Sequence, residues 1–321
     1  MRRRDRVDIL LATYNGERFL DRQIESALDQ MGSGCRLLIR DDGSTDATMS
    51  IARRWASRGS NNIVILEDQS ANLGICGNFN CLLQHSDADY IVFCDQDDVW
   101  LPGRISETLA QIKATEQALG TATPVLAHTD LKVVDENLDT IAPSFWAYSN
   151  LDPYRGNAFN RLLMQNVVTG CATVINRALA RRAYPIPPEA LMHDWWLALV
   201  ASAFGRIKTI PQKTVLYRQH ADNQVGASRP SWKHSVRRGL EIIWSGASSQ
   251  IFKGIQRQTV AFSSRFAMNL PPGYQTSMDA FINLGNTGFF ERRLKLLYYG
   301  FLKTGLLRKL GWLTSNALAP E

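Results

Sequence analysis

The amino-acid sequence predicts an α/β fold built on a mostly parallel sheet whose two faces are covered by helices. Over roughly the first 120 residues, short apolar runs of strand length alternate with segments of helical period. Polar clusters follow three of these runs, at the ends of the predicted strands. The chain has 321 residues, of which 45% are hydrophobic and 21% are charged. These are globular proportions, which exclude disordered, collagen-like and coiled-coil classes.

The first strand is predicted at residues 7–13, where the run VDILLAT is apolar. Apolar residues at positions 20, 24, 27, 28 and 31 then share one helix face, and Gly32 ends that helix. The second strand, residues 36–40, ends in the polar run DDGSTD. The second helix has its apolar face at positions 49, 51, 52 and 55, and Ser44 or Thr45 is expected to cap it.

Residues 63–66 predict a third strand, residues 75–83 a third helix, and residues 90–94 a fourth strand that ends in DQDD. Pro102 suits the first turn of a helix, so the next helix is predicted to open there. Strands joined by helices at this spacing form right-handed crossovers and parallel sheets. Beyond residue 124 the sequence predicts strands at 125–128 and 171–175, a helix at 193–204, and a strand pair at 207–210 and 213–217.

Charge is distributed unevenly along the chain. The sequence has 36 Lys and Arg residues against 30 Asp and Glu, a formal charge of +6. Residues 1–228 carry a net charge of −3 and residues 229–321 carry +9. We therefore expect one unit at 1–228 and a helical, basic region at 229–321.

Cysteine spacing and apolar run lengths limit the class of protein. The five cysteines are odd in number and form no C-x-x-C pair, so neither a zinc site nor a disulfide framework is supported. Asp8 interrupts any signal-peptide core, and the longest apolar run, 195–204, is about half of what a membrane span needs. We expect a cytoplasmic protein with no secretion signal and no transmembrane segment.

The cluster Asp95-Gln96-Asp97-Asp98 indicates a metal site. Carboxylates packed this tightly repel one another unless a cation joins them. Mg²⁺ and Mn²⁺ take oxygen ligands, usually one or two carboxylates plus substrate phosphates. The alternative is an acidic turn at the start of the following helix. The second cluster, residues 41–44 (DDGS), offers acceptors for a base or ribose, but a plain turn with a helix cap explains it equally.

The order of these motifs resembles glycosyltransferase family 2, whose members have the GT-A fold. LLATYNGERFL, IRDDGSTDAT, ANLG and YIVFCDQDDVWLP carry the resemblance, which covers about residues 7–225. FCDQDDVW, HTDLKVVDENLDTI, HDWWLALVASAFG and YRQHADNQVGA make the chain most similar to bacterial rhamnosyltransferases of surface polysaccharide synthesis. The resemblance implies a nucleotide-sugar half at about 1–123 and an acceptor half at about 124–228.

The same resemblance implies an inverting, metal-dependent glycosyltransferase. It would move a sugar, with rhamnose expected, from dTDP-rhamnose or a UDP-sugar to a glycan or lipid-linked acceptor. Thr13, Tyr14 and Asn15 would line the nucleotide pocket. Asp42 would contact the base and Asp95 would lie near the ribose.

The remaining implied roles concern the metal, the base and the acceptor. Asp97 would bind Mg²⁺ or Mn²⁺, and His220 would reach the metal or diphosphate, although a structural hydrogen bond is the alternative. Asp194 would be the general base, with a helix cap as its alternative, and His193 stands where the family has an acidic residue. Trp195 and Trp196 would contact the acceptor, with one of the two expected in the core because adjacent helix residues point in different directions.

The C-terminal region predicts a basic amphipathic helix. On a helical wheel, Arg292, Lys295 and Lys303 gather opposite an apolar face made by residues 294, 297, 298 and 301. Such a helix can lie on an anionic membrane, here the inner face of the cytoplasmic membrane. The alternative is a helix packed on the catalytic unit with its basic face in water.

Three other functions predict features that this sequence does not have. A sugar-1-phosphate nucleotidyltransferase predicts a Gly-rich loop with Arg and Lys after the first strand, where this chain has ATYNGERF. A dinucleotide oxidoreductase needs G-x-G-x-x-G at that place, and it is absent. A basic nucleic-acid-binding protein is disfavoured by the acidic first 228 residues, so no nucleic-acid partner is expected.

Overall fold

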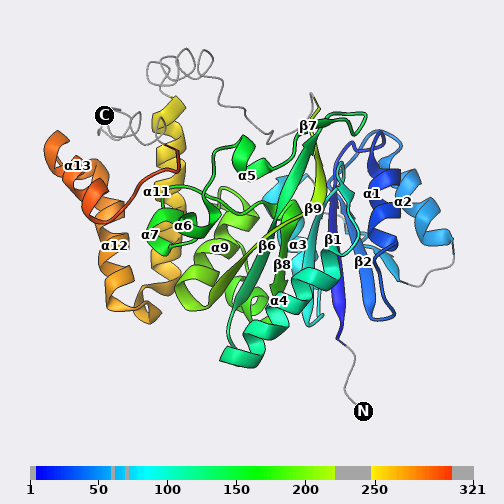
Figure 1. Cartoon of the computed structure of the whole chain (residues 1–321), viewed down its shortest axis with the longest axis horizontal. Helices are drawn as coiled ribbons and strands as arrows, with labels where there is room; N and C mark the ends of the chain where they lie inside the picture. The colour runs from blue at the N-terminus through cyan, green and yellow to red at the C-terminus, as the bar shows by residue number, and fades with distance from the viewer. Residues whose placement is uncertain (1–4, 59–61, 69–71, 221–246, 306–321) are drawn as a thin grey trace.

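The computed structural model describes residues 5–58, 62–68, 72–220 and 247–305. Within these ranges a mixed sheet of nine strands runs through the centre, in the order β3-β2-β1-β4-β8-β6-β9-β5 with β7 beside β6. Helices cover both faces of the sheet, as Figure 1 shows. The predicted α/β layering is therefore confirmed.

The first half of the sheet is parallel and forms from the predicted strand–helix units. The strands are β1 (Val7–Thr13), β2 (Cys35–Asp41), β3 (Ile63–Ile65) and β4 (Tyr90–Asp95), and the helices are α1 (Leu20–Leu28), α2 (Thr48–Ser57) and α3 (Gly74–His85). In the register, Thr13 pairs with Asp41, and Ala12 pairs with Asp95. The polar residues that follow β1, β2 and β4 therefore meet at one edge, the upper edge of the sheet in Figure 1.

The second half of the sheet mixes strand directions. β8 (Thr173–Asn176) runs antiparallel to β4 and to β6 (Val125–Val134), while β6 pairs in parallel with β9 (Arg206–Arg218). The other elements of this half are β5 (Val99–Trp100), α4 (Arg104–Leu119), β7 (Thr140–Ala142), α5 (Phe145–Tyr148), α6 (Pro153–Gly156), α7 (Phe159–Leu162), α8 (Arg177–Ala183) and α9 (His193–Phe204).

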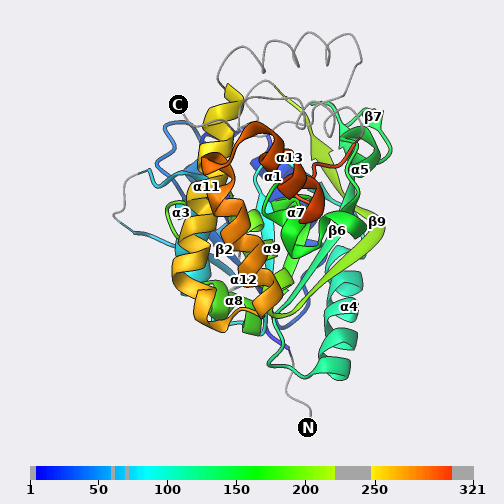
Figure 2. The ribbon, with the colours of Figure 1, turned by 90° about the vertical axis from the view of Figure 1, so that its left-hand side faces the viewer.

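Two hydrophobic cores lie on opposite faces of the sheet, because successive strand residues point to opposite faces. Ile9 and Leu37 face the core that α1, α2 and α4 cover. Leu10, Leu38 and Phe93 face the core that α3, α8 and α9 cover. This second core continues outward into α11 (Ala247–Phe266) and α12 (Pro272–Ile282), which stand in front of α9 in Figure 2.

Aromatic contacts join the C-terminal helices to the rest of the fold. The Phe262 ring of α11 lies 5.5 Å from Trp196 and 6.5 Å from Phe204, both on α9. On α12, the Phe281 ring packs 5.9 Å from Phe252 of α11. The helical character expected for the C-terminal region is confirmed over residues 247–305. The expected boundary near residue 228 lies outside the described residues, so the division into two units remains a prediction.

Several local expectations were wrong. The strand pair around Pro211 is one strand, β9, whose pairing with β6 shifts register between Thr129 and Asp130 and so accommodates the proline. α4 begins at Arg104 instead of Pro102, because Gly103 lies before it at a φ of 88° that ends the preceding turn. Ser44 and Thr45 do not cap α2, which begins at residue 48.

On the last described helix, α13 (Phe289–Tyr298), Arg292 packs inward and the apolar residues Leu294, Leu297 and Tyr298 on the opposite face are exposed. Arg292 is buried and donates hydrogen bonds to the carbonyls of Leu284, Gly285 and Thr287. Phe301, which the helical wheel placed on the apolar face, lies beyond the end of α13 and is fully buried. These carbonyls satisfy the buried guanidinium, so the alternative that leaves the basic face in water is wrong for Arg292. In the part of the chain that the structure describes, we find no helix with the length and apolar character of a membrane span.

We predict that α11 unfolds together with the sheet. Phe262→Ala should lower the free energy of unfolding by about 3–5 kcal/mol, because it opens a cavity in the shared core. The measurement is urea unfolding followed by tryptophan fluorescence. Met268→Ala, at a position that is 96% exposed, is the matched control and should change little. A separate early transition with an unchanged main midpoint in Phe262→Ala would contradict the shared core.

Candidate active site

The loop after β1 is tied to the two neighbouring loops at the sheet edge. The Asn15 N–H donates to Ser44 Oγ at 2.8 Å, and Asn15 Oδ1 accepts from the Thr45 N–H at 2.8 Å. Tyr14 exchanges two bonds with Gln96, from its N–H to Oε1 at 2.8 Å and from Nε2 to its carbonyl at 2.9 Å. The predicted nucleotide-pocket residues therefore lie between the DDGS and DQDD loops.

Thr13 and Tyr14 have different environments within this loop. Thr13 is buried, and its hydroxyl donates to Asp41 Oδ1 at 2.8 Å. The Tyr14 side chain is 41% exposed at the sheet edge. Tyr14 is thus free to meet a ligand, whereas Thr13 acts on the loop through Asp41.

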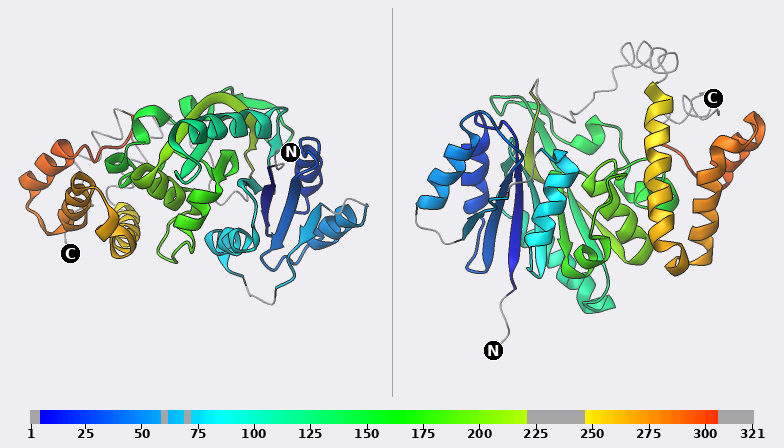
Figure 3. Two further views of the ribbon diagram at one scale, coloured as in Figure 1. Left: turned by 90° about the horizontal axis from the view of Figure 1, so that it is seen from below. Right: turned by 180° about the vertical axis from the view of Figure 1, so that it is seen from behind.

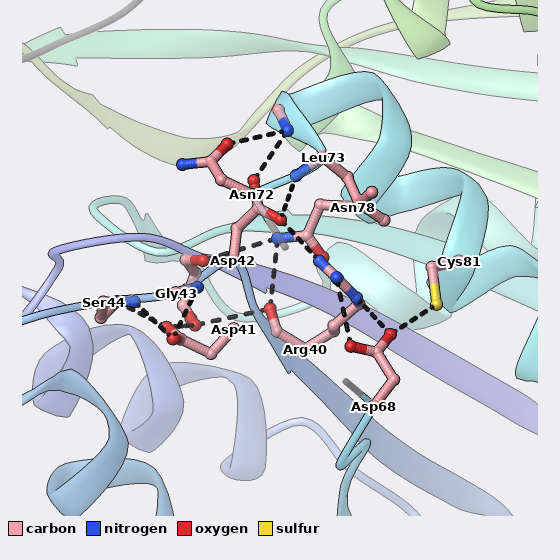
Figure 4. Close-up of polar contacts among 12 residues, drawn as sticks. Arg40, Asp41, Asp42, Gly43, Ser44, Asp68, Asn72, Leu73, Asn78 and Cys81 are labelled. Carbon is pink, nitrogen blue, oxygen red and sulfur yellow. Dashed lines mark hydrogen bonds and ion pairs between the residues drawn. The ribbon is translucent and has the colours of Figure 1, made fainter. Parts of the chain in front are cut away.

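Asp42 is the centre of a buried ion-pair network, drawn in Figure 4. Its Oδ1 accepts from Arg40 Nη1 at 2.7 Å and from the Leu73 N–H at 2.8 Å, and its Oδ2 accepts from the Gly74 N–H at 2.8 Å. Arg40 is fully buried and also donates from Nε to Asp68 at 2.8 Å. Asp42 therefore fixes the start of α3 against the end of β2, and its predicted contact with the base remains a prediction.

The structure brings Asp97 and His220 together across the site. His220 Nε2 lies 2.8 Å from Asp97 Oδ2, although 123 residues separate them. The His220 ring packs 4.8 Å from the Phe19 ring, and Arg218 Nε donates to the Asp97 carbonyl at 2.7 Å. The two predicted metal ligands therefore lie side by side, as two ligands of one metal ion must.

Beneath them lies a buried acidic cluster. Asp95, Asp98 and the Cys171 thiol have ligand atoms within 4.8 Å of one another. Burial and the charge of Asp97 raise the pKa of Asp95 to about 7. The same two causes, with Asp95 added, raise the pKa of Asp98 well above its usual range. Asp98 accepts a hydrogen bond from the Arg218 N–H at 3.1 Å, which links the loop after β4 to the end of β9.

Arg104 is a residue of this region that the sequence analysis missed. Its guanidinium is fully buried, donates to the Phe93 carbonyl at 3.1 Å and lies 4.4 Å above the Trp100 ring. Its positive charge lowers the pKa of Asp95 and opposes the effect of burial. One sequence signal could have identified it: Arg104 directly precedes Ile105, which was predicted to face the core. An arginine at such a position would ordinarily be expected to be exposed.

Asp194, the predicted base, lies in the first turn of α9 and is 6% exposed. Its Oδ1 accepts from the Trp195 N–H at 2.6 Å and from Asn166 Nδ2 at 3.1 Å. Burial raises the pKa of this carboxyl to about 7. Its charge in turn raises the pKa of Asp95, so the two groups share one electrostatic environment. A carboxylate with such a pKa can accept a proton near neutral pH.

His193 is held in an aromatic pocket next to Asp194. Its ring lies 4.1 Å from the Phe79 ring and 5.1 Å from the Phe93 ring. Burial lowers its pKa to about 3, so the imidazole is neutral. His193 therefore fills the core behind the base, where the resemblance led us to expect an acid.

The two tryptophans after Asp194 differ in position. Trp196 is fully buried, and its indole N–H donates to the Ala183 carbonyl at 3.0 Å. The prediction that Trp196 contacts the acceptor is therefore wrong, because α9 turns this side chain into the core. Trp195 is half-buried, and its indole N–H donates to the Leu162 carbonyl at 2.6 Å. Its contact with an acceptor remains a prediction.

Comparisons with known proteins show which sequences this chain is similar to. The family model "Glycosyl transferase family 2" matches residues 8–183. The chain is 29% identical over 230 residues to dTDP-rhamnosyl transferase RfbG of Shigella flexneri, which covers 68% of this chain and 74% of that protein. It is 32% identical over 103 residues to the Escherichia coli UDP-Glc:alpha-D-GlcNAc-diphosphoundecaprenol beta-1,3-glucosyltransferase WfaP, covering 32% of this chain and 39% of that protein.

Solved structures match in fold. Mannosyltransferase PcManGT from Pyrobaculum calidifontis, in complex with GDP-Man and Mn²⁺, aligns with a TM-score of 0.56 and 16% identity over 93% of this chain and 74% of that chain. S. aureus TarS 1–349 in complex with UDP-GlcNAc aligns with a TM-score of 0.55 and 14% identity over 90% and 83%. These matches confirm the predicted GT-A fold.

We predict that Asp194 makes the folded state less stable as pH rises. Its raised pKa means that the folded protein favours the protonated carboxyl, so this contribution to stability is present below about pH 4 and is lost as pH rises to about 7. Asp194→Asn, which stays neutral, should therefore be the more stable protein at pH 8, by up to about 4 kcal/mol.

The measurement is urea unfolding of wild type and Asp194→Asn from pH 4 to pH 8. The difference between the two proteins should grow up to about pH 7 and then level off. Asp29→Asn, at an exposed position, is the control and should give a difference that does not follow this course. A constant difference for Asp194→Asn would show that the carboxyl has an ordinary pKa.

Proposed function

Because the chain belongs to glycosyltransferase family 2, we propose that it is an inverting, metal-dependent rhamnosyltransferase. It transfers rhamnose from dTDP-rhamnose to a glycan or lipid-linked acceptor in surface polysaccharide synthesis. The observation that carries the proposal is the meeting of two different sites at one sheet edge. One is the Asp97–His220 pair, and the other is the buried Asp194 with its pKa near 7.

The donor half of the proposal rests on the loops after β1, β2 and β4. Tyr14 is exposed there, and the Asn15 and Asp42 hydrogen bonds hold the neighbouring backbone in place. We assign the nucleotide to this region, with Thr13, Tyr14, Asn15, Asp42 and Asp95 around it. The printed name of the RfbG relative supports dTDP-rhamnose as the donor.

The residues around Asp97 fit a divalent cation. A carboxylate and an imidazole 2.8 Å apart offer one oxygen and one nitrogen ligand. Burial raises the pKa of Asp95, and the negative charges of Asp97 and Asp194 add to this effect, which a bound cation would oppose. Asp97 and His220 would hold Mg²⁺ or Mn²⁺, and the ion would balance the charge that the departing diphosphate gains.

Asp194 serves as the general base in this mechanism. The acceptor hydroxyl attacks the anomeric carbon on the face opposite the diphosphate, and its proton passes to Asp194. The new glycosidic bond forms as the bond between that carbon and the diphosphate oxygen breaks. A single displacement of this kind inverts the anomeric centre. Asn166 and the Trp195 N–H orient the carboxylate for the transfer.

We further propose that α13 places the enzyme on an anionic membrane, where a lipid-linked acceptor would be found. Five large apolar side chains are more than half exposed on this helix: Phe289 at 51%, Phe290 at 82%, Leu294 at 68%, Leu297 at 52% and Tyr298 at 83%. Complete burial of one such side chain is worth roughly 1.5–3 kcal/mol. Each nearby Lys or Arg adds about 1 kcal/mol against an anionic surface, so the apolar contact dominates and the charge assists.

We predict that dTDP-rhamnose with Mn²⁺ raises the melting temperature of the protein by several degrees. A ligand that binds only the folded state must stabilise it. UDP-glucose and GDP-mannose should have smaller effects. EDTA and Asp97→Asn should each remove the shift, while Asp29→Asn keeps it.

Each outcome of this experiment bears on a separate part of the proposal. A larger shift with another donor would overturn rhamnose as the sugar. A full shift in EDTA, or in Asp97→Asn, would overturn the metal assignment. No shift with any nucleotide sugar would overturn the donor site itself.

We predict that the protein co-sediments with phosphatidylglycerol-containing vesicles and binds less at high salt, because salt screens the charged part of the contact. Leu294→Asp should abolish co-sedimentation. Met268→Asp makes the same apolar-to-acidic change at a position that is 96% exposed, in the turn after α11. This variant should still co-sediment. Equal binding by both variants would show that α13 is not the membrane contact. Dimerisation of wild type that Leu294→Asp abolishes would assign the face to a second copy instead.

A further inference from the structure

The segment between α8 and α9, residues 184–192, decides where the proposed base lies. It contains neither helix nor strand, and it ends two residues before Asp194. The Met192 carbonyl accepts the Trp196 N–H at 3.1 Å, so α9 begins from the end of this segment. Any movement of the segment would therefore move the first turn of α9 and Asp194 with it.

The C-terminal helix α11 holds this segment at two points. At one end, Arg265 donates to the carbonyls of Arg182, Ala183, Tyr184 and Pro185. Near the other end, the Leu191 N–H donates to Gln258 Oε1 at 2.9 Å. Gln258 is fully buried, so water does not compete for this bond.

The surface of α11 is also shaped to receive the segment. A Cβ atom on Gly254 would lie 2.9 Å from the Leu191 side chain, so the helix and Leu191 approach each other more closely than a larger residue allows. On the other side, α3 adds two bonds: the Ile186 N–H donates to Asn80 Oδ1 at 2.7 Å, and the Cys76 thiol lies 3.7 Å from the Ala190 carbonyl. Seen from behind, α3 and α11 stand on either side of the part that carries α8 and α9 (Figure 3).

We infer that Gln258 is a positioning residue for the proposed base: through Leu191 it keeps the start of α9, and with it Asp194, in its buried place. This inference rests on the proposed function only in calling Asp194 the base. The geometric claim concerns the burial of Asp194 and stands by itself. It gives the C-terminal region a part in the chemistry that charge distribution alone did not indicate.

The environment of Asp194 makes this claim measurable. The titratable groups that face it are Cys76 from α3, Asp95 at the end of β4, and the neutral His193 beside it. Burial is the main cause of the raised pKa of Asp194. If the segment loosens, water reaches the carboxyl and its pKa falls toward the ordinary value. Cys76, whose own pKa is raised to about 12 chiefly by burial, would become more reactive at the same time.

The test compares Gln258→Leu with a matched control on the same helix, Gln256→Leu. Gln256 donates to the Ile282 carbonyl at 3.2 Å, so its side-chain hydrogen bond goes to the end of α12 and not to the segment. The first measurement is alkylation of Cys76 by iodoacetamide, followed by peptide mass spectrometry. Gln258→Leu should raise its rate about tenfold, because loss of one buried hydrogen bond eases local opening. Cys81, on the same helix α3 beside Asp68, is the internal standard and should not change.

The second measurement addresses Asp194 directly and does not depend on any donor. The pH-dependent difference in unfolding between Asp194 and Asp194→Asn is measured in the wild-type and the Gln258→Leu backgrounds. It should shrink in Gln258→Leu and persist in Gln256→Leu. An unchanged difference, or Cys76 labelling equal to the control, overturns the inference.

Two further arms separate this inference from the proposed function. If Gln258→Leu does not fold, Arg265→Lys loosens the other attachment of the segment and is tested in the same way. If dTDP-rhamnose transfer is established, the acidic limb of the kcat/KM profile should move to lower pH in Gln258→Leu, with kcat reduced and the donor KM retained. Failure to bind any nucleotide sugar would sink the proposed function and leave the thiol and unfolding results valid.

Discussion

The crowding of carboxylates at one sheet edge is the constraint on which the rest of this structure depends. Asp95, Asp97 and Asp98 lie at the end of β4, and the first turn of α9 brings Asp194 into the same electrostatic environment. Buried negative charges are costly unless cations or hydrogen-bond donors face them. The fully buried Arg104, backbone N–H groups and the Asp97–His220 pair meet part of this need. Burial is the main cause of the raised pKa values of Asp95, Asp98 and Asp194, and neighbouring negative charges add to it for Asp95 and Asp98. Such values suit a site that takes up a cation and a proton.

Hydrogen bonds within the protein also hold the loops around the site in place. Gln96 bonds to Tyr14 on both sides of its amide, and Asp42 holds the start of α3 through two backbone N–H groups. Such bonds cost no reorganisation when substrate binds, which is how fixed polar groups act in catalysis. The Arg40–Asp42–Asp68 network in Figure 4 likewise fixes polar groups in place, here within the buried part of the fold.

Local sequence patterns predicted the first half of the fold well, because alternating strands and helices there each bury one clear face. They failed where a distant partner decides. Pro211 suggested a break, but a register shift in β6 lets β9 continue. A helical wheel cannot tell which face of α13 packs inward, and the carbonyls that bind Arg292 come from the preceding turn. The sequence likewise could not show which of two adjacent tryptophans faces the core. The meeting of His220 with Asp97 was implied by the family resemblance and not by the local pattern.

The C-terminal helices illustrate why charge and packing carry different information about organisation. Net charge reports only composition, and residues 229–321 are basic on that measure. Packing reports which residues fold together, and Phe262 lies within the same core as α9. Gln258 adds a polar contact to the segment that precedes the proposed base, while α13 turns its apolar side chains outward. A region with one face in the core and another exposed can support the base and meet a surface at once.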